Sequence, residues 1–459
     1  MKILTYNVSQ ALQTSIYKEI ARELGDKIEI YRISETPIDN EGLANFHVID
    51  IDSVKVNSSI ASFQKKYDFS IQKALVTDRE VMNYSTFNNF EKYTGFTDEF
   101  EEILLKYLIV LDEYIPKMDF LVLGLADNFK SSLAWNIAEY YNIKHYSSFP
   151  LYWWKSGLFI TDTIYQTSSL IDKTYKKYYD DQSVELDEKK LLSRYDKKVI
   201  SYQFKDNQKL PFLHRLQAIR NNQRAHNRLN VKHWILRRFF YFYTKILVKL
   251  FVKREENIVD NENFVLYPMH IIPEAATLGS NPEIADQFSL IKNISMNLPY
   301  GVKLYVKEHP GQVIGYGMHY DFYRKLLSVN NIKIVHKNVN TKELYQRENC
   351  LALAVINGTL GLEAALVKKP VFVFGEAIYG VAECFYKIKD FSDFFTALQN
   401  IIDMKFVFNK RALLSILQAL EDSNFDFADL SEAKTYEEYA RLGATEFVNK
   451  LIDYHQGNK

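Results

Sequence analysis

This sequence has few cysteines, no long apolar run and no excess of positive or negative charge. Two cysteines, Cys350 and Cys384, are too few for a disulfide framework or a cysteine-built zinc site, so we expect a reducing compartment. No uninterrupted apolar stretch reaches the roughly 20 residues that span a bilayer. Lys and Arg together number 57, as do Asp and Glu, so the whole chain has no long-range attraction to nucleic acid. We expect no nucleic-acid partner.

We expect no signal peptide at the beginning of the sequence. Residues 1–8 hold a short apolar run that soon meets polar side chains, which is typical of a first strand and not of a signal peptide. We therefore expect a cytoplasmic protein. Aspartate, glutamate and histidine do not gather at metal-ligand spacing in the sequence, and we predict no metal and no bound cofactor.

Strand and helix patterns alternate in both halves of the chain, which predicts an α/β protein with parallel sheets. At 459 residues, two domains of ordinary size are expected. We predict four segments: an N-terminal Rossmann-like domain over 1–164, a helical basic connection over 165–258, a C-terminal Rossmann-like domain over 259–392, and C-terminal helices over 393–459 that cross back to the N-terminal domain.

Two short motifs follow strands of the second predicted domain. Residues 307–310, Lys-Glu-His-Pro, come after the alternating apolar run 302–306, and residues 357–363 come after the buried run 351–356 and open a helix. Ligands bind at the carboxyl ends of parallel strands, and a helix start favours an anion, so we predict one shared phosphate site. Taken singly, His309 could be a surface turn residue, and Asn357-Gly358-Thr359 only a helix cap.

Three acidic residues stand close to predicted strand ends. Asp127 follows the buried strand 119–124, Asp162 follows the apolar run 158–160, and Glu274 lies in the loop after the strand 264–268. Each position suits a carboxylate at the edge of a sheet. For Asp127 the alternative is a cap for the helix predicted over 131–141.

A basic segment occupies the end of the connection. Between His214 and Arg254 the sequence has many arginines and lysines but no acidic residue, and Trp234 to Phe251 mixes these cations with large apolar side chains. This composition is typical of a helix that lies on a membrane surface, which would place the protein at the inner face of the cell membrane. The competing interpretation is an amphipathic helix packed between the domains. Single-stranded nucleic acid is a third fit, but no recognition motif accompanies it.

Four motifs together resemble a known family. Tyr267–Leu278, Val306–Pro310, Asn357–Ala364 and Lys369–Gly375 resemble, in order and spacing, the bacterial capsule and surface polysaccharide biosynthesis proteins. That group is similar to the Kdo transferases and more remotely to sialyltransferases of the GT-B fold, in which two Rossmann-like domains face a cleft. The resemblance covers about residues 264–379. Sialyltransferases have paired hydroxyl residues where this chain has a single one, and their acidic-Asp-Gly motif is absent from the N-terminal half.

The resemblance implies a metal-independent glycosyltransferase. Its donor would be a nucleotide sugar, CMP-linked Kdo or a sialic-acid-like sugar, and its acceptor a capsule or lipopolysaccharide glycan, free or lipid-linked. Glycosyl transfer needs a carboxylate as base or nucleophile, for which Asp127 is the first choice and Asp162 and Glu274 the others. The predicted nucleotide-sugar-binding residues are Lys307, Glu308, His309, Pro310, Asn357, Gly358, Thr359 and Glu363.

Two other functions fit the same motifs. One is a GT-B-shaped enzyme of another class, such as an epimerase acting on a UDP-sugar, which would prefer UDP to CMP. The other is a non-catalytic assembly protein that holds polysaccharide machinery at the membrane through the basic segment.

Overall fold

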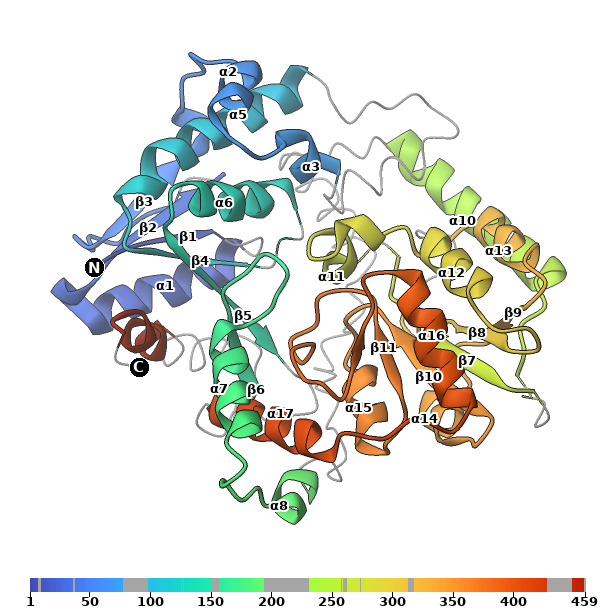
Figure 1. Ribbon diagram of the computed structural model, residues 1–459. Helices are drawn as coiled ribbons and strands as arrows, with labels where there is room; N and C mark the ends of the chain where they lie inside the picture. Colours follow the sequence, from blue (N-terminus) through green and yellow to red (C-terminus); the bar gives the residue numbers. More distant parts are fainter. Residues whose placement is uncertain are drawn as a thin grey trace.

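The computed structural model describes residues 1–6, 10–35, 38–76, 98–124, 126, 128–150, 157–193, 231–256, 258, 262–272, 274–312, 318–426 and 448–457. Within these ranges the chain forms two α/β units, each built on its own sheet (Figure 1). Both sheets consist mainly of parallel strands joined by helices. The predicted pair of Rossmann-like units is therefore confirmed.

The first sheet has seven strands in the order β13-β6-β5-β4-β1-β2-β3. The five strands from β5 to β3 in this order are parallel to one another. Strand β6 runs antiparallel to β5, and β13 runs antiparallel to β6. The strands are β1 (Lys2–Tyr6), β2 (Glu29–Ser34), β3 (Phe46–Asp50), β4 (Phe120–Leu123), β5 (Lys144–Pro150), β6 (Gly157–Thr161) and β13 (Phe425–Asp426).

Helices cover both faces of this first sheet. One face packs on α1 and on the C-terminal helical residues 448–455, and the other packs on four helices that lie between β3 and β5 in the chain. Figure 1 shows the C-terminal helix beside α1. The helices are α1 (Gln10–Leu24), α2 (Ile60–Lys66), α3 (Ile71–Val76), α5 (Asp98–Tyr114) and α6 (Phe129–Tyr140).

The second sheet has six parallel strands in the order β12-β11-β10-β7-β8-β9. Its central strands are continuously apolar because helices cover them on both sides. The strands are β7 (Phe264–Pro268), β8 (Lys303–Lys307), β9 (Ile332–Val335), β10 (Cys350–Val355), β11 (Val371–Val373) and β12 (Tyr386–Lys387). The helices are α10 (Val231–Phe251), α11 (Ala275–Leu278), α12 (Gln287–Met296), α13 (Tyr320–Leu327), α14 (Thr341–Gln346), α15 (Leu360–Leu366) and α16 (Phe391–Ile402).

The two units are joined at several places. Helix α17 (Lys410–Asp422) packs against α7 (Ser169–Asp180) and α8 (Glu188–Ser193), and its apolar side chains share a core with the second sheet. Lys73 of α3 forms a 2.7 Å ion pair with Glu283, which follows α11. Both side chains of this pair are largely exposed, so it contributes less than about 1 kcal/mol, and the shared apolar core carries most of the connection.

Three local expectations are corrected by the structure. In the sequence, Asn281 followed by Pro282 predicts an N-cap and a first-turn proline for the helix that contains Ile291. The structure begins α12 at Gln287 and caps it with Asp286, and the Asn281 side chain accepts a hydrogen bond from the distant Glu376 amide instead. The basic helix α10 does not pack between the units: its described buried residues join the core of the second unit. The short strand β13 interrupts the C-terminal helices expected over 393–459.

Candidate functional site

Three loops meet at the carboxyl edge of the second sheet. Strand β7 lies between β8 and β10, so the loop after β7 is flanked by the two loops that carry the predicted phosphate motifs. The His309 motif follows β8, and the motif at residues 357–359 follows β10. The predicted placement of both motifs at strand ends on one edge of a sheet is confirmed, and the strand order adds a third loop between them.

The loop after β7 carries a histidine and a carboxylate in direct contact. Nδ1 of His270 lies 2.8 Å from Oε2 of Glu274, which stands immediately before α11. Two buried glutamines fix this loop. Gln287 accepts from the His270 amide at 3.0 Å and donates to its carbonyl at 3.2 Å, and Gln312 binds the amide and carbonyl of Ile272 in the same way. The imidazole is therefore presented on a backbone held at two points.

The contact with Glu274 defines the roles of the two ring nitrogens of His270. Burial would raise the pKa of Glu274, but the hydrogen bond and charge of His270, with a smaller effect from His309, bring this pKa below its ordinary value. An ionised Glu274 can only accept, so Nδ1 of His270 donates to it. Nε2 then remains for another partner, and it lies 3.6 Å from the position that a Cβ atom on Gly358 would occupy.

His309 sits in a tight turn after β8. The Gln312 amide donates to the His309 carbonyl at 3.0 Å, and Pro310 occupies the second position of this turn, where its fixed φ is favourable. The Gly311 amide donates to Nδ1 of His309 at 3.0 Å, so that nitrogen is an acceptor and Nε2 carries the proton of the neutral ring. Burial lowers the pKa of His309, although the charge of Glu274 opposes the shift. The neutral ring thus offers an N–H donor.

Two predicted ligand residues face the interior. The ammonium of Lys307 donates to the carbonyls of Glu308 and Lys337, and burial lowers the pKa of Lys307 to about 8. The Glu308 carboxylate accepts from the Tyr323 hydroxyl and from the Lys337 amide. Both side chains are almost fully buried, so they brace the turn that presents His309 from within the protein.

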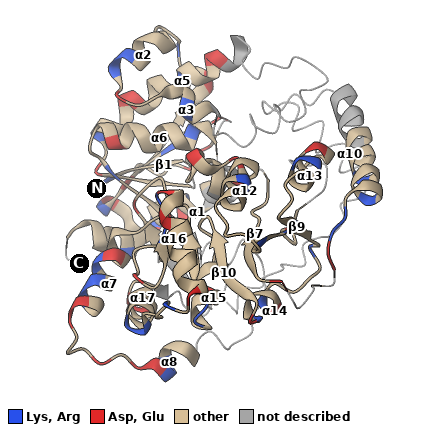
Figure 2. Ribbon diagram, turned by 45° about the vertical axis from the view of Figure 1, so that its right-hand side comes forward, with Lys and Arg blue, Asp and Glu red and all other residues tan. Residues whose placement is uncertain are grey.

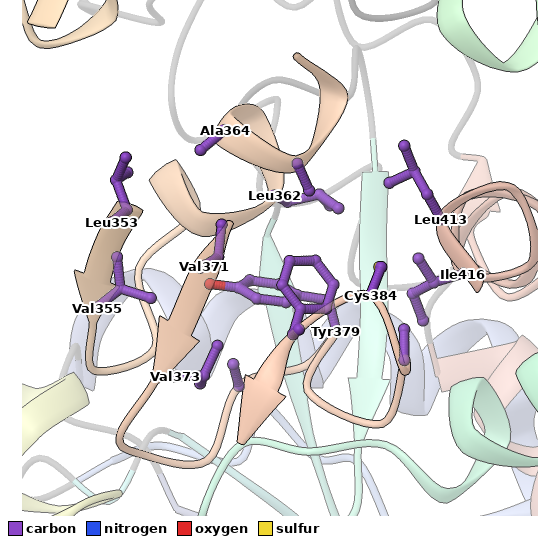
Figure 3. Packing of buried hydrophobic residues seen from close by; sticks show 14 of the residues in the cluster. Leu353, Val355, Leu362, Ala364, Val371, Val373, Tyr379, Cys384, Leu413 and Ile416 are labelled. Atoms are coloured by element: carbon purple, nitrogen blue, oxygen red, sulfur yellow. The ribbon is translucent and has the colours of Figure 1, made fainter. Parts of the chain in front are cut away.

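The helix α15 begins beside His270. Thr359 is its N-cap residue, but its side chain makes no capping hydrogen bond, and the Tyr379 hydroxyl donates to the Gly358 carbonyl. Figure 3 shows Tyr379 beneath this helix, among the apolar side chains of β10, β11 and α15. A Cβ atom on Gly361 would lie 3.1 Å from Cζ of Tyr379 and closer still to its hydroxyl, so only glycine fits there.

Other predicted residues at this edge have mixed surroundings. Glu363 stands one turn into α15, where burial raises the pKa of its carboxyl and the charge of Lys342 opposes the shift. Pro310 is exposed, and Asn357 and Gly358 are half-buried at the end of β10.

The two acids predicted in the first unit differ in position. Asp127 lies outside the described residues; its neighbour Asn128 caps α6, accepting from the Ser131 amide at 3.0 Å. Asp162 follows β6, and the antiparallel register puts the end of that strand beside Ser147 in β5, not beyond the carboxyl edge. Its carboxylate accepts from the Ser169 amide at the start of α7. Asp162 has thus lost the sheet-edge position for which it was selected.

His270 is the site residue that sequence reasoning missed. The available signal was a histidine and a glutamate four residues apart directly after a buried strand. At the carboxyl edge of the first sheet, Glu35 also contacts the Lys130 ammonium and accepts from the Tyr107 hydroxyl, a cluster that was not foreseen. Across the described ranges, no three His, Cys, Asp or Glu side chains are grouped so as to hold a metal ion.

Comparison with protein families gives one match. Residues 158–384 match the family described as "Capsule polysaccharide biosynthesis protein". The matched stretch contains nearly all of β6, the strands β7 to β11 and all three loops of the candidate site, and it includes every residue of the four motifs that carry the resemblance seen in the sequence. The resemblance to this family is confirmed. A comparison with curated proteins finds no match.

Several solved structures are similar at low identity. KpsC of Thermosulfurimonas dismutans, a β-Kdo 2,4-transferase, has 11% identity and a TM-score of 0.33, with 65% of this chain and 79% of that chain covered. HepE of Anabaena in complex with UDP-glucose has 10% identity and a TM-score of 0.30, with 99% and 100% covered. S. aureus MnaA with UDP has 13% identity and a TM-score of 0.27, with 99% and 97% covered. These values are too low to transfer a ligand or a reaction.

Proposed function

Residues 158–384 match the capsule polysaccharide biosynthesis family, and from this premise we propose that the chain is a glycosyltransferase. It moves a sugar from a nucleotide-activated donor to a growing capsule or lipopolysaccharide glycan. The donor binds at the carboxyl edge of the second sheet, and the acceptor approaches from the first unit.

The arrangement of His270, Glu274 and His309 beside Gly358 carries this proposal. Breaking the bond between a sugar and its nucleotide leaves negative charge on a phosphate oxygen, and donors already in place stabilise such charge. Nε2–H of the neutral His309 is one donor. His270, when protonated at Nε2, is a second, and the Glu274 carboxylate at 2.8 Å balances the charge on its ring. The Gly361 and Leu362 amides of α15 already donate to the Gly358 and Thr359 carbonyls, so the start of this helix contributes through its dipole, which favours negative charge there.

Glu274 acts through His270 in this scheme. Its carboxylate is engaged with Nδ1, so it orients the ring in the way that the acid of a catalytic triad orients its histidine. The carboxylate that takes the proton of the acceptor hydroxyl, or that attacks the anomeric carbon, is then Asp127 of the first unit. Asp127 follows β4, whose carboxyl end faces the same edge as the ends of β1 and β2.

The donor nucleotide is CMP, a choice that rests on the resemblance of the His309 and Thr359 motifs to those of enzymes using CMP-sugars. A calorimetric binding screen with CMP, UDP, GDP and TDP tests it. We expect CMP to bind most tightly and His270→Gln to weaken it. A preference for UDP would replace CMP as the donor nucleotide, and the absence of binding by any of the four would overturn the proposed site.

Transfer itself is tested with CMP-Kdo and CMP-sialic acid, each with capsule or lipopolysaccharide glycan as acceptor. The expected result is release of CMP that depends on the acceptor and continues in EDTA, because the proposed charge stabilisation comes from side chains and amides. Loss of turnover in EDTA with recovery on adding a divalent cation would contradict the metal-independent scheme. Interconversion of a UDP-sugar without an acceptor would assign the chain to the epimerases.

A further inference from the structure

Among the side chains that are described in helix α10, residues 239–251, one face contacts the described part of the protein. Thr244 and Val248 are buried, and with Val252 just beyond the helix they face the core that contains α12 and α13. The Phe240 ring lies against His319, with ring centroids 5.0 Å apart. Figure 1 shows α10 at the outer side of the second unit, next to α13. The helix is therefore held firmly, and its remaining faces are free of the core.

A second face of α10 is apolar and exposed. Its residues are spaced three or four apart, so they form one continuous stripe along the helix. The relative exposures, which are high for such large side chains, are 70% for Phe239, 61% for Phe242, 51% for Tyr243, 40% for Ile246 and 67% for Leu250. Single exposed apolar residues are common on proteins, but a contiguous stripe of this kind marks an interaction surface.

Positive charge adjoins this stripe. Lys245 and Lys249 are exposed on the flank of α10, whereas Lys253, which follows the helix with its side chain 81% exposed, forms a 2.9 Å ion pair with Glu255. Figure 2 shows Lys and Arg, but no Asp or Glu, along the described part of α10. The sequence has no acidic residue from His214 to Arg254, so the local potential is positive although the net charge of the chain is zero.

We propose that the outer face of α10 binds an anionic membrane surface. The stripe enters the boundary between headgroups and acyl chains, and the flanking lysines contact lipid phosphates, as in helices that lie in the interface plane. An acidic protein surface would attract the lysines. It would not account for the five large apolar side chains of the stripe, which need an apolar environment to become buried. No described helix combines the length and apolar character needed to cross a membrane. The inference does not rest on the proposed reaction.

Co-sedimentation of the full chain with vesicles tests the proposal. We expect binding to phosphatidylcholine vesicles containing about one-third phosphatidylglycerol, and much weaker binding to phosphatidylcholine alone. Lys245→Gln with Lys249→Gln should lower affinity about 25-fold, since each cation near such a surface is worth about fivefold. Phe242→Ser with Ile246→Ser and Leu250→Ser should lower it by at least tenfold, because these groups no longer enter the apolar boundary.

Matched controls distinguish binding through the outer face of α10 from non-specific adsorption to vesicles. Lys189→Gln with Lys190→Gln removes the same charge from exposed positions on α8, and Tyr300→Ser with Met404→Ser and Val407→Ser removes three apolar groups that are even more exposed and lie elsewhere. Both control proteins should bind vesicles like the wild type. Circular dichroism and thermal melting confirm that all variants fold. Equal loss in the controls, no binding of the wild type, or full binding of both α10 variants would overturn the proposal, as would concentration-dependent self-association that the α10 variants alone abolish without any vesicle binding.

Discussion

The imidazole of His270 and the carboxylate of Glu274 are joined by a 2.8 Å contact across the loop that links β7 to α11. Gln287 and Gln312 fix the backbone of this loop, because each forms two hydrogen bonds with it. Supporting hydrogen bonds of this kind are expected where the orientation of a functional side chain must be fixed. The free Nε2 of His270 faces Gly358 at the start of α15.

The pair should behave as one unit in catalysis. Glu274→Gln keeps the size of the side chain but removes its charge, and His270→Gln removes the ring; each should lower kcat by about 10²–10⁴-fold. If Glu274 acts only through His270, the double variant should lose little more than either single one. Steady-state kinetics of the four proteins measures this. Strictly multiplicative losses would instead give Glu274 an independent role, as the catalytic carboxylate considered from the sequence.

His309 should contribute mainly to donor binding. His309→Ala removes one hydrogen bond to a charged group, worth roughly 1.5–3 kcal/mol, so nucleotide affinity should fall about ten- to a hundredfold. His336→Ala is the matched control, because His336 follows the next strand, β9, and its Nδ1 likewise accepts from an amide two residues on, at 3.3 Å. Calorimetry should find normal nucleotide affinity in the control. Equal effects at both positions would mean that the loss is not specific to the site.

The partial burial of His309 also predicts a pH dependence of stability. Burial lowers its pKa in the folded protein, so between that value and the ordinary value near 6.5 the unfolded chain binds more protons. The resulting stability is complete above about pH 6.5 and is lost as the pH falls towards the folded pKa. Urea unfolding at several pH values should therefore show the wild type losing stability on acidification relative to His309→Gln. A constant difference between the two proteins would contradict this.

Much of this edge could be predicted because its signals are local. The buried run before residue 357, the Pro310 turn and the helix start each depend on a few adjacent residues, and the structure places them at strand ends. What failed depends on distant neighbours. Strand order puts β7 between β8 and β10, which no short pattern encodes, so His270 was not selected as a site residue. Asp162 was misplaced because its strand runs antiparallel, and Asn281 because its partner is residue 376.

Substitution of Asp127 and of Asp162, the two acids considered in the first unit, should have different effects on turnover. Asp127→Asn retains the size of the side chain but cannot accept a proton or attack carbon, so turnover should fall about 10²–10⁴-fold with donor affinity unchanged. Asp162→Asn should stay within a few fold of wild type, because its amide oxygen can still accept from the Ser169 amide. Turnover assays and donor binding on both variants decide the matter. A large loss in Asp162→Asn alone would return the catalytic role to that residue.

A single added methyl group should lower stability at one of the two glycines near the start of α15 and leave it unchanged at the other. A Cβ on Gly361 would collide with the Tyr379 ring and hydroxyl, so Gly361→Ala should lower the free energy of unfolding by about 1–3 kcal/mol, and the Tyr379 hydrogen bond to the Gly358 carbonyl should weaken. A Cβ on Gly358 would meet only His270, at 3.6 and 3.7 Å, which is ordinary van der Waals contact. Gly358→Ala should therefore unfold like the wild type.

Ligand binding should reverse this order. The methyl group on Gly358 would occupy the space beside Nε2 of His270, where the donor phosphate is proposed to lie, so nucleotide affinity should fall by roughly tenfold or more. Gly361 faces Tyr379 in the core, and its variant, once folded at low temperature, should bind nucleotide far better than Gly358→Ala does. Urea unfolding and calorimetry on the same preparations test both halves. If Gly358→Ala binds nucleotide like the wild type, the phosphate does not lie between His270 and α15.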